Sequence, residues 1–337
     1  MRIKIIFVAA IIFIVAVGCK PQPASYSVVE GAMLGTSLRI VADAECTPEV
    51  IYSRAMQIDS TLKAEMSIFD SQSLISRINR GETTKLTAGL EYNLHLSDSV
   101  SRLSAGAYDV TVMPLVRAYG FAGDKAEQHP NIDSLLEFVG YEKISVKEGH
   151  LIRQDARTQI DLNSIAKGYT VDVVARALEE LGAKNYLVDI GGEIHCRGVN
   201  KQGNPWRIGV ESPIDGNMTN GEFIQKCLTI PPDSPYRAMA TSGNYRRFYL
   251  NDQGERVSHT IDPRTGLSRH STLLSVTVIA PTCALADAYS TMFMAVGDTE
   301  AINLAKRLTN CEVYFIFASK GDSYREYLSE GMRTLIL

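Results

Sequence analysis

Residues 161–194 read DLNSIAKGYTVDVVARALEELGAKNYLVDIGGEI, and this stretch holds the pattern that decides the fold. Apolar side chains recur in it at helical spacing, which predicts a helix over Asn163–Leu181 that is ended by Gly182. The short apolar run Tyr186–Ile194 predicts a strand directly after that helix. A strong helix next to a buried strand indicates a layered domain in which helices cover a sheet.

Other segments add helices and strands on both sides of this stretch. An alternating pattern around two glycines predicts a β-hairpin over Tyr26–Ala42. Further helices are expected at Thr47–Lys63, Glu91–Leu103, Ala284–Val296 and Thr299–Leu308, further strands at Leu273–Ala280 and Glu312–Ala318, and a polar, broken excursion over residues 119–160. Because no regular βαβ rhythm connects these elements, the sequence predicts an α+β (mixed α/β) fold with mixed β-sheets flanked by helices.

The composition is that of a globular protein without a nucleic-acid function. Of the 337 residues, 45% are hydrophobic and 21% are charged, which excludes disordered, collagen-like and disulfide-scaffold proteins. The formal net charge is −4, and without Arg2 and Lys4 of the leader the 34 basic residues fall to 32 against 38 acidic ones. An acidic chain without a run of Lys or Arg is not expected to bind DNA or RNA.

The first residues predict export and a lipid anchor. Met1–Lys4 is a short basic region, and the apolar run Ile5–Val17 is too short for a membrane span of roughly 20 residues but typical of a signal peptide. The run ends in Ala16-Val17-Gly18-Cys19, which resembles a bacterial lipobox. We expect a lipoprotein signal peptide over 1–18, acylation of Cys19, a lipidated tether over 19–25 and one domain over 26–337. A plain secretory signal and an uncleaved anchor are the alternatives.

The start of the predicted central helix is the first candidate site. In Asp161–Gly168, small and polar residues lie where free backbone N–H groups and the helix dipole favour an anion. Lys167 in the first turn is unfavourable there unless a negative group binds beside it. Gly168 would let another element pack close to the backbone. An exposed lysine beside an ordinary Asn or Ser N-cap is the alternative.

The helix predicted over Ala284–Val296 holds the second candidate site. Asp287 and Thr291 are four residues apart and therefore share one face of this helix. Small and apolar residues flank that face, so we expect Asp287 to be buried, and an unpaired buried carboxylate is unfavourable. A hard cation such as Mg²⁺, completed by a third oxygen and substrate phosphates, would stabilise it. An aspartate that caps a neighbouring helix or pairs with an arginine is the alternative.

The third candidate site is the loop Ser258–Gly266. Pro263 and Gly266 predict a tight turn, and His259 lies among polar groups, which favours a general base near neutral pH. A solvated loop histidine is the alternative. Glycine-bearing turns that would let the backbone approach a ligand, and that are also typical of ordinary loops, lie at Gly106–Asp109, Gly191–Glu193 and Ala240–Asn244.

A different combination of these motifs is similar to the marks of penicillin-binding proteins and β-lactamases. Ser164-Ile-Ala-Lys167 would supply the nucleophile, followed by Ser242-Gly-Asn244 and Arg264-Thr-Gly266. The third triplet has Arg in place of the usual Lys and lies in a predicted turn rather than a strand. This assignment also gives Asp287 and Thr291 no role, so we do not favour it.

Taken together and in order, the motifs resemble the FAD:protein FMN transferase (ApbE) family. The resemblance rests on Met33–Thr36, Met66–Phe69, Gly106–Thr111, Pro114–Val116, Asp161–Gly168, Val188–Glu193, Ala240–Gly243, His259–Gly266 and Ala286–Thr291. It implies an ApbE-type fold with the flavin site between two lobes. It also implies a transferase that moves FMN from FAD onto a Thr hydroxyl of a target flavoprotein, through a phosphoester bond, with Mg²⁺ as cofactor and release of AMP.

The resemblance further implies roles for single residues. Asp287 and Thr291 match metal ligands, and Ser164 would supply a third oxygen from its hydroxyl or its carbonyl. His259 would be the base for the incoming Thr hydroxyl, a role that Asp287 would share. The positions that match the FAD site are Met33, Phe69, Ala107, Tyr108, Asp109, Asp161, Lys167 and Ile261. Two positions depart from the family: Phe69 replaces a common Tyr, and Asn163-Ser164 replaces a small Gly/Ala pair.

Many members of that family are lipoproteins that face the periplasm, in agreement with Cys19. We therefore expect a lipid anchor in a bacterial membrane, with the domain in the periplasm. The expected targets are flavoprotein subunits of membrane electron-transfer complexes or secreted flavoproteins. Two alternatives share the fold. One is a Mg²⁺-dependent FAD pyrophosphatase that releases FMN and AMP with water as nucleophile, and the other is a non-catalytic flavin-binding lipoprotein.

Overall fold

The computed structural model describes residues 25–123, 125–127, 130–213, 223–244, 248–250, 256–258, 260–268, 271–319 and 323–337. The predicted signal peptide, Cys19 and His259 lie outside the described residues. The division into signal peptide, tether and one domain therefore stays a prediction. Within the described part of the chain, no helix is both long enough and apolar enough to cross a membrane.

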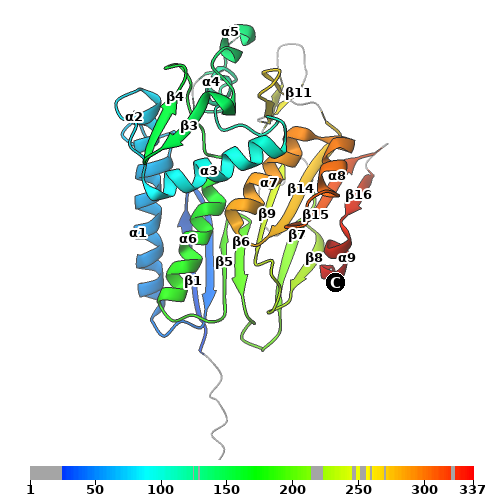
Figure 1. Ribbon diagram of the computed structural model, residues 1–337. Coiled ribbons are helices and arrows are strands. Elements are labelled where there is room, and N and C mark those ends of the chain that lie inside the picture. Colours follow the sequence, from blue (N-terminus) through cyan, green and yellow to red (C-terminus); the bar gives the residue numbers. More distant parts are fainter. Residues whose placement is uncertain are drawn as a thin grey trace, which may run out of the picture.

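An eight-stranded sheet forms the centre of the fold, in the order β1-β2-β5-β6-β9-β14-β15-β16 (Figure 1). Its strands are β1 (Ser27–Met33), β2 (Thr36–Ala42), β5 (Tyr186–Ile190), β6 (Glu193–Arg197), β9 (Ala238–Gly243), β14 (Leu273–Ala280), β15 (Glu312–Ala318) and β16 (Tyr324–Leu328). The α+β class is confirmed, but the pairings in this sheet are antiparallel where a mixed sheet was expected. Short hairpin turns such as those between β1 and β2 and between β5 and β6 allow only antiparallel neighbours.

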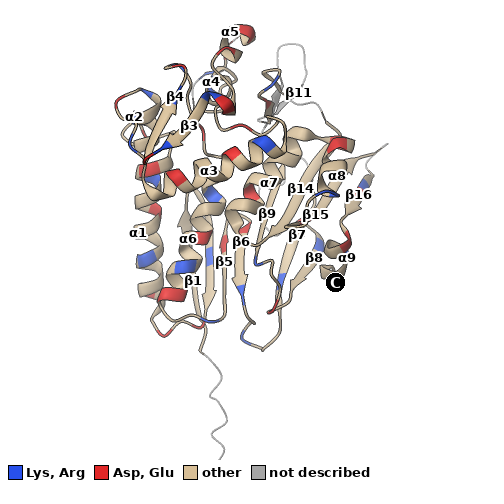
Figure 2. Ribbon diagram, viewed as in Figure 1, with Lys and Arg blue, Asp and Glu red and all other residues tan. Residues whose placement is uncertain are grey.

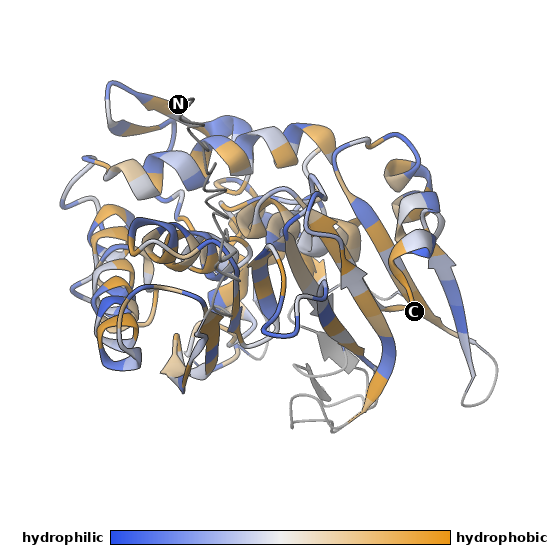
Figure 3. Ribbon diagram, turned by 90° about the horizontal axis from the view of Figure 1, so that it is seen from below, coloured by the Kyte–Doolittle hydropathy of each residue, from blue (hydrophilic) through white to orange (hydrophobic). Residues whose placement is uncertain are grey.

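The two faces of the sheet are covered differently, and the strands alternate accordingly. Along β15, Val313, Phe315 and Phe317 pack into the main core, while Tyr314 and Ile316 pack into a second core. The main core lies under the helices, and the second lies under the hairpin of β7 (Trp206–Glu211) and β8 (Ile224–Ile230) and under α9 (Glu330–Leu335). The same alternation of hydrophobic and hydrophilic residues is visible along the strands in Figure 3.

In the described part of the chain, the five longest helices lie on the main core, and two of them begin at a side-chain cap. The structure has α1 (Pro48–Met66), α3 (Ala88–Leu103), α6 (Ala166–Glu180), α7 (Cys283–Val296) and α8 (Asp298–Ala305). The side chain of Thr87 accepts a hydrogen bond from the backbone of Leu90 at the start of α3, and Thr282 does the same for Leu285 in α7. All five predicted helices are confirmed, with ends that differ by a few residues. The central helix begins at Ala166 rather than Asn163, because Ser164 and Ile165 form a turn before it.

The excursion after α3 builds a small subdomain at one end of the sheet. It contains α4 (Met113–Ala118), α5 (Ile132–Leu136), a 3₁₀ turn η1 (Tyr141–Lys143), β3 (Ile144–Lys147) and β4 (His150–Arg153). The short helix α2 (Leu74–Asn79) lies beside it in Figure 1. The described remainder of the 248–268 region adds β10 (Phe248–Leu250), β11 (Arg256–Ser258), β12 (Ile261–Asp262) and β13 (Leu267–Ser268).

One predicted strand is two strands. The run Tyr186–Ile194 was expected to be continuous, but β5 ends at Ile190 and β6 begins at Glu193. Gly191 and Gly192 form the turn, with φ of 61° and 96°. A Cβ atom on Gly191 would lie 2.5 Å from the methyl carbon of Thr36, so the turn needs glycine for space as well as for backbone conformation. This turn places Glu193 at the start of β6.

Charge is distributed without a dominant patch. Figure 2 shows basic and acidic residues interspersed along the described elements, with no continuous basic stripe among them.

Candidate active site

The starts of α6 and α7 meet at Gly168. Its backbone N–H donates a hydrogen bond to Oδ2 of Asp287, with a donor–acceptor distance of 2.9 Å. A Cβ atom at position 168 would lie 2.3 Å from the carbonyl oxygen of Cys283 and 2.8 Å from Cβ of Asp287. Only glycine allows this approach, and the approach fixes Asp287 against the first turn of α6.

A second carboxylate, Asp172, fixes the start of α7. Its Oδ1 accepts a hydrogen bond from the backbone of Cys283 at 2.8 Å, and its Oδ2 accepts one from Ala284 at 2.9 Å. Nδ1 of His195 lies 2.8 Å from the same Oδ1. A negative group at a helix N-terminus is favourable. Asp172 was not among the residues predicted for the site, although its position four residues after Gly168, on the apolar face of the predicted helix, was the available signal.

Asp287 is a buried carboxylate on a helix that also carries hydroxyl groups near it in the chain. It is 4% exposed, and burial raises the pKa of Asp287, while the Lys167 ammonium and the Gly168 N–H act to lower that pKa. The hydroxyl of Ser290 donates to the backbone oxygen of Asp287 at 2.9 Å. Oγ of Ser242, on β9, lies 2.8 Å from Oγ of Ser290 and 3.4 Å from Oγ1 of Thr291. The predicted pair Asp287 and Thr291 is thus part of a group of oxygen atoms from α7 and β9.

Ser164 joins the same region through a buried tyrosine. Its hydroxyl donates a hydrogen bond to the phenol oxygen of Tyr108 at 2.9 Å, and Oγ of Ser97 lies 3.4 Å from that phenol oxygen. Burial raises the pKa of the Tyr108 phenol far above its usual range, and the nearby charges of Asp287 and Asp161 add to the rise. The tyrosine therefore stays protonated. Its contact with Ser164 and its proximity to Asp287 link the third predicted ligand to the other two.

This donor set fits Mg²⁺. Within the ranges that the structure describes, no group of three or more His, Cys, Asp or Glu side chains could hold a metal ion. A site at Asp287 would therefore combine one carboxylate with hydroxyl or carbonyl oxygens of Ser164 and Thr291 and with oxygens of a substrate. Hard oxygen ligands of this kind, completed by phosphates, suit Mg²⁺ and do not suit Zn²⁺.

Lys167 is a paired cation rather than an exposed lysine. Its Nζ lies 2.6 Å from Oε2 of Glu193, and the lysine side chain is 35% exposed while that of Glu193 is 4% exposed. Burial acts to lower the pKa of Lys167, but the carboxylates of Glu193 and Asp287 act more strongly in the other direction. The pKa of Lys167 is therefore raised. Burial also raises the pKa of Glu193 to about 7, against the opposing effect of Lys167. The alternative that Lys167 is solvated beside an N-cap is wrong.

The segments of Asp109 and Asp161 are joined by a backbone hydrogen bond, and each carboxylate bonds within its own segment. The backbone N–H of Asp161 donates to the carbonyl of Val110 at 2.8 Å, and Oδ1 of Asp161 accepts from the backbone of Asn163 at 2.8 Å. Oδ1 of Asp109 accepts from both the N–H and the hydroxyl of Thr111, each at 2.7 Å. Burial raises the pKa of each aspartate to about 6. The carboxyl group of Asp161 lies beside the Ser164 turn, because it bonds to the backbone of Asn163.

The remaining residues predicted for the FAD site lie in different surroundings. Met33 and Ala107 are each 1% exposed and belong to the main core. Ile261, at 6% exposure, packs with Leu115, Val116 and Val139 under the excursion. Phe69 is 64% exposed, and its ring lies within 3.8 Å of the position that a Cβ on Gly123 would take. An exposed aromatic ring of this kind is available to stack on a flavin.

The described part of the third motif is a turn. Asp262 accepts two hydrogen bonds from the guanidinium of Arg264, each at 2.9 Å, and the residues between β12 and β13 form the turn that was predicted. Thr260 donates to the side chain of Asn244 at 2.7 Å, which anchors this loop next to the end of β9. The β-lactamase-like assignment fails here, because Ser164 bonds to Tyr108 and Lys167 to Glu193 instead of to each other.

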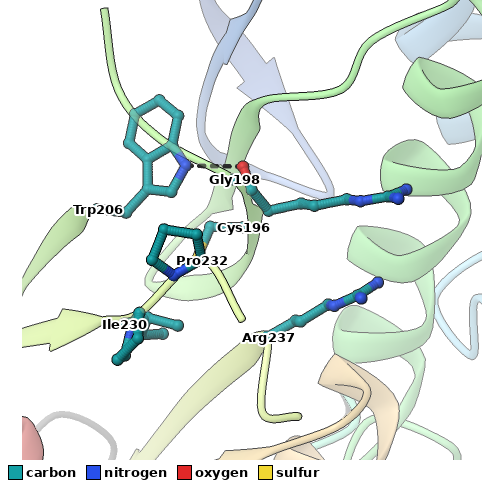
Figure 4. A pocket seen from close by; sticks show the side chains of 8 residues that line it. Cys196, Gly198, Trp206, Ile230, Pro232 and Arg237 are labelled. Carbon is teal, nitrogen blue, oxygen red and sulfur yellow. Dashed lines mark hydrogen bonds between the residues drawn. The ribbon is translucent and has the colours of Figure 1, made fainter. Parts of the chain in front are cut away.

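A hollow in the surface lies away from this site. It is lined by eight residues that include Cys196, Trp206 and Arg237, and it holds about 170 Å³ with open solvent included (Figure 4). The indole of Trp206 closes one side by donating a hydrogen bond to the carbonyl of Arg197. The hollow lies at the opposite end of β6 from Glu193 and is smaller than the roughly 300 Å³ at which ligand sites begin. It is not a candidate site for FAD.

Comparisons with known proteins agree with this architecture. A family profile described as "ApbE family" matches residues 34–315. The FAD:protein FMN transferase of Haemophilus influenzae is 34% identical over 302 residues, which cover 84% of this chain and 85% of the relative. The FAD:protein FMN transferase of Escherichia coli K12 is 31% identical over 356 residues, which cover 99% of this chain and 97% of the relative. The solved structure of flavin transferase ApbE from Vibrio cholerae has a TM-score of 0.81 and 29% identity and covers 93% of this chain and 100% of that one. The crystal structure of Pseudomonas stutzeri flavinyl transferase ApbE in its apo form has a TM-score of 0.79 and 28% identity. It covers 92% of this chain and 96% of that one.

Proposed function

The chain belongs to the ApbE family of FAD:protein FMN transferases, and from this premise we propose that it moves FMN from FAD onto a threonine hydroxyl of a target flavoprotein, with release of AMP. The enzyme is a transferase and FAD is its substrate. The observation that carries the proposal is the junction of α6 and α7. There the buried Asp287, the backbone N–H of Gly168 and the ammonium of Lys167 converge beside a group of hydroxyl oxygens.

The reaction breaks the pyrophosphate bond of FAD and forms a phosphoester bond. The phosphorus of FMN is attacked by the threonine oxygen, the proton of the hydroxyl is taken up by a base, and AMP leaves with the electron pair of the broken bond. Such a transfer depends on charge neutralisation and positioning more than on covalent catalysis. Lys167 at the start of α6 supplies a cation where backbone N–H groups also favour an anion.

Mg²⁺ is proposed as the cofactor, held by Asp287, Thr291 and Ser164. When bound, it would neutralise negative charge on the pyrophosphate oxygens. Tyr108 keeps the Ser164 hydroxyl in one orientation, and Gly168 keeps Asp287 in place. These oxygen ligands would come from two segments, the turn before α6 and the helix α7, and would be in place before substrate arrives, which favours the transition state without a cost of rearrangement during the reaction.

The proposal is tested by removing the metal. With FAD, Mg²⁺ and a peptide or domain that carries an acceptor threonine, the chain from Lys20 onward is expected to release AMP, and excess EDTA is expected to stop the release. Restoring Mg²⁺ after EDTA is the control for irreversible loss of the fold. AMP release at an equal rate in EDTA would contradict the proposed metal dependence.

His259 is proposed as the base that accepts the proton of the threonine hydroxyl. The support is its place next to Thr260, which is anchored to the end of β9 near Ser242. His259→Ala is expected to lower the rate of transfer by about 10²–10⁴-fold and to leave FAD affinity within about twofold. The measurements are single-turnover transfer and FAD titration. An unchanged rate would assign the base to another group, with Asp287 the next candidate.

The location and the targets are proposals from the leader and the family. We propose that Cys19 is lipidated and anchors the domain to a bacterial membrane on its periplasmic side. Flavoprotein subunits of membrane electron-transfer complexes, or secreted flavoproteins, would then be within reach as acceptors. The support is the lipobox-like sequence at the end of the apolar run.

A further inference from the structure

Glu193 is a buried carboxylate that the reaction described above does not use. It opens β6 directly after the Gly191–Gly192 turn and is 3% exposed. Its Oε2 lies 2.6 Å from Nζ of Lys167, yet within the described structure no hydrogen-bond donor is aligned on that oxygen. The contact is therefore an ion pair in which the glutamate is almost completely removed from water and the lysine is not.

The surroundings show why this position would hold a carboxylate. Lys167 lies in the first turn of α6, where the helix dipole disfavours a cation. The charged and titratable groups that act on its ammonium come from three elements: Glu193 on β6, Asp287 and Cys283 on α7, and Asp189 on β5. Of these groups, Glu193 makes the direct ion pair with the ammonium. It also has the largest effect in raising the pKa of Lys167 against the effect of burial.

A lone buried carboxylate is strongly unfavourable unless it is paired. Glu193 therefore needs Lys167, and Lys167 needs an anion at the helix start. The carboxylate of Asp287 is hydrogen-bonded to the backbone of Gly168, so it is not free to move toward Lys167 and pair with it directly. Glu193 is the carboxylate that can fix the ammonium beside Asp287 and leave it facing the position of a pyrophosphate.

We propose that Glu193 is a positioning residue for FAD binding: through its ion pair it fixes the ammonium of Lys167 at the start of α6, where the ammonium meets the pyrophosphate. The inference rests on the proposed function, because it takes FAD as the ligand. It assigns to the glutamate of the Gly-Gly-Glu turn a role that acts only through Lys167.

A double-mutant cycle on FAD affinity tests this role. The chain from Lys20 onward is titrated with FAD in the presence of EDTA, so that FAD is bound but not consumed. Glu193→Gln is expected to weaken binding about tenfold at pH 7.5, and Lys167→Met at least as much. In the Lys167→Met background, Glu193→Gln is expected to cause no further loss. A further tenfold loss in that background would show that the glutamate acts independently of the lysine and would overturn the proposal.

The pH profile of binding separates positioning from a merely structural effect. In the wild type, Lys167 keeps its charge beyond pH 9.5, because the neighbouring carboxylates raise its pKa. In Glu193→Gln the largest of these effects is gone, so the pKa of the lysine is expected to lie below its wild-type position, because burial still acts to lower it and, of Glu193 and Asp287, only Asp287 still acts to raise it. Between pH 7.5 and 9.5, FAD affinity is expected to stay level in the wild type and in Glu193→Asp. In Glu193→Gln it is expected to fall measurably as the pH rises. A level profile in Glu193→Gln would contradict the proposal.

Two comparisons keep the test decisive. Glu180→Gln removes an exposed glutamate at the other end of α6, whose partner Arg54 lies 3.4 Å away, and should bind FAD as the wild type does. If Glu193→Gln does not fold, Glu193→Asp is measured in its place at pH 7.5. The aspartate side chain is shorter than that of glutamate, so we expect it to fix Lys167 less well and to weaken FAD binding measurably. Binding equal to the wild type would then overturn the proposal. Failure of the proposed function would appear instead as a wild-type chain that binds FAD and transfers nothing.

Discussion

Asp287→Ala is expected to reduce FMN transfer by more than about 10³-fold and to remove the Mg²⁺ dependence of FAD binding. The carboxylate is 4% exposed, it meets the first turn of α6 through Gly168, and it is the one acid in the proposed ligand set. Without it, the hydroxyls of Ser164 and Thr291 are neutral ligands that hold a divalent cation weakly. The measurements are AMP release and FAD titration with and without Mg²⁺.

Asp287→Asn separates the loss of charge from the loss of shape. The amide oxygen of asparagine can still accept the hydrogen bond from Gly168, so the junction of α6 and α7 is expected to remain intact while transfer is lost. Asp98→Ala is the matched control, because Asp98 lies on the exposed side of α3 in an ion pair with Arg102. It should transfer FMN as the wild type does. Full activity of Asp287→Asn would remove this residue from the metal site.

Gly168→Ala is expected to abolish transfer and to destabilise the fold, although it adds a single methyl group. The new Cβ would lie 2.3 Å from the carbonyl oxygen of Cys283, which is backbone and cannot rotate away. The two helices must separate, and overpacking of this kind costs about 1–3 kcal/mol or more in the free energy of unfolding. Separation also breaks the hydrogen bond that holds Asp287. Thermal unfolding and AMP release measure the two effects.

Gly89→Ala is the matched control for this substitution. Gly89 also lies in the first turn of a helix, but a Cβ there would meet only the ends of the Met66, Glu65 and Tyr169 side chains, at 3.1 to 3.2 Å. Those atoms can move, and alanine is a better helix former than glycine by up to about 1 kcal/mol. Stability and activity of Gly89→Ala are expected to stay close to the wild type. Equal behaviour of the two variants would contradict the packing explanation for Gly168.

The sequence predicted the elements that carry strong local signals. The helix around Lys167, the helix around Asp287 and the hairpin at the start of the domain are all confirmed, because each has a clear apolar period and a cap or turn residue. The single strand predicted over 186–194 was wrong, since two adjacent apolar strands have no polar boundary between them. Only the Gly191-Gly192 pair marked the turn.

The chemistry of the site was only partly visible in the sequence. That Gly168 permits a close approach was predicted, but its partner on α7 lies more than a hundred residues away and could not be identified from spacing. In the sequence Glu193 stands out only as part of a glycine-bearing turn, and no local pattern indicates that its side chain is buried. Its burial depends on Lys167 being brought opposite to it by the packing of α6 on the sheet.

Tyr108 illustrates the same limit for a residue that the family resemblance placed in the FAD site. Its side chain is 2% exposed, and its phenol holds the hydroxyl of Ser164. The contact joins two segments that are 56 residues apart in the chain, so no local pattern indicated it. The structure therefore assigns Tyr108 a part in orienting a proposed ligand.

The most direct measurement is the intact mass of an acceptor that carries a target threonine, after incubation with the chain from Lys20 onward, FAD and Mg²⁺. The account predicts that the acceptor gains one FMN on that threonine, that one AMP appears for each FMN gained, and that both products are absent with EDTA or with Asp287→Asn. AMP and free FMN with several unlabelled acceptors would contradict it and would identify a pyrophosphatase. Bound FAD without either product would identify a flavin carrier.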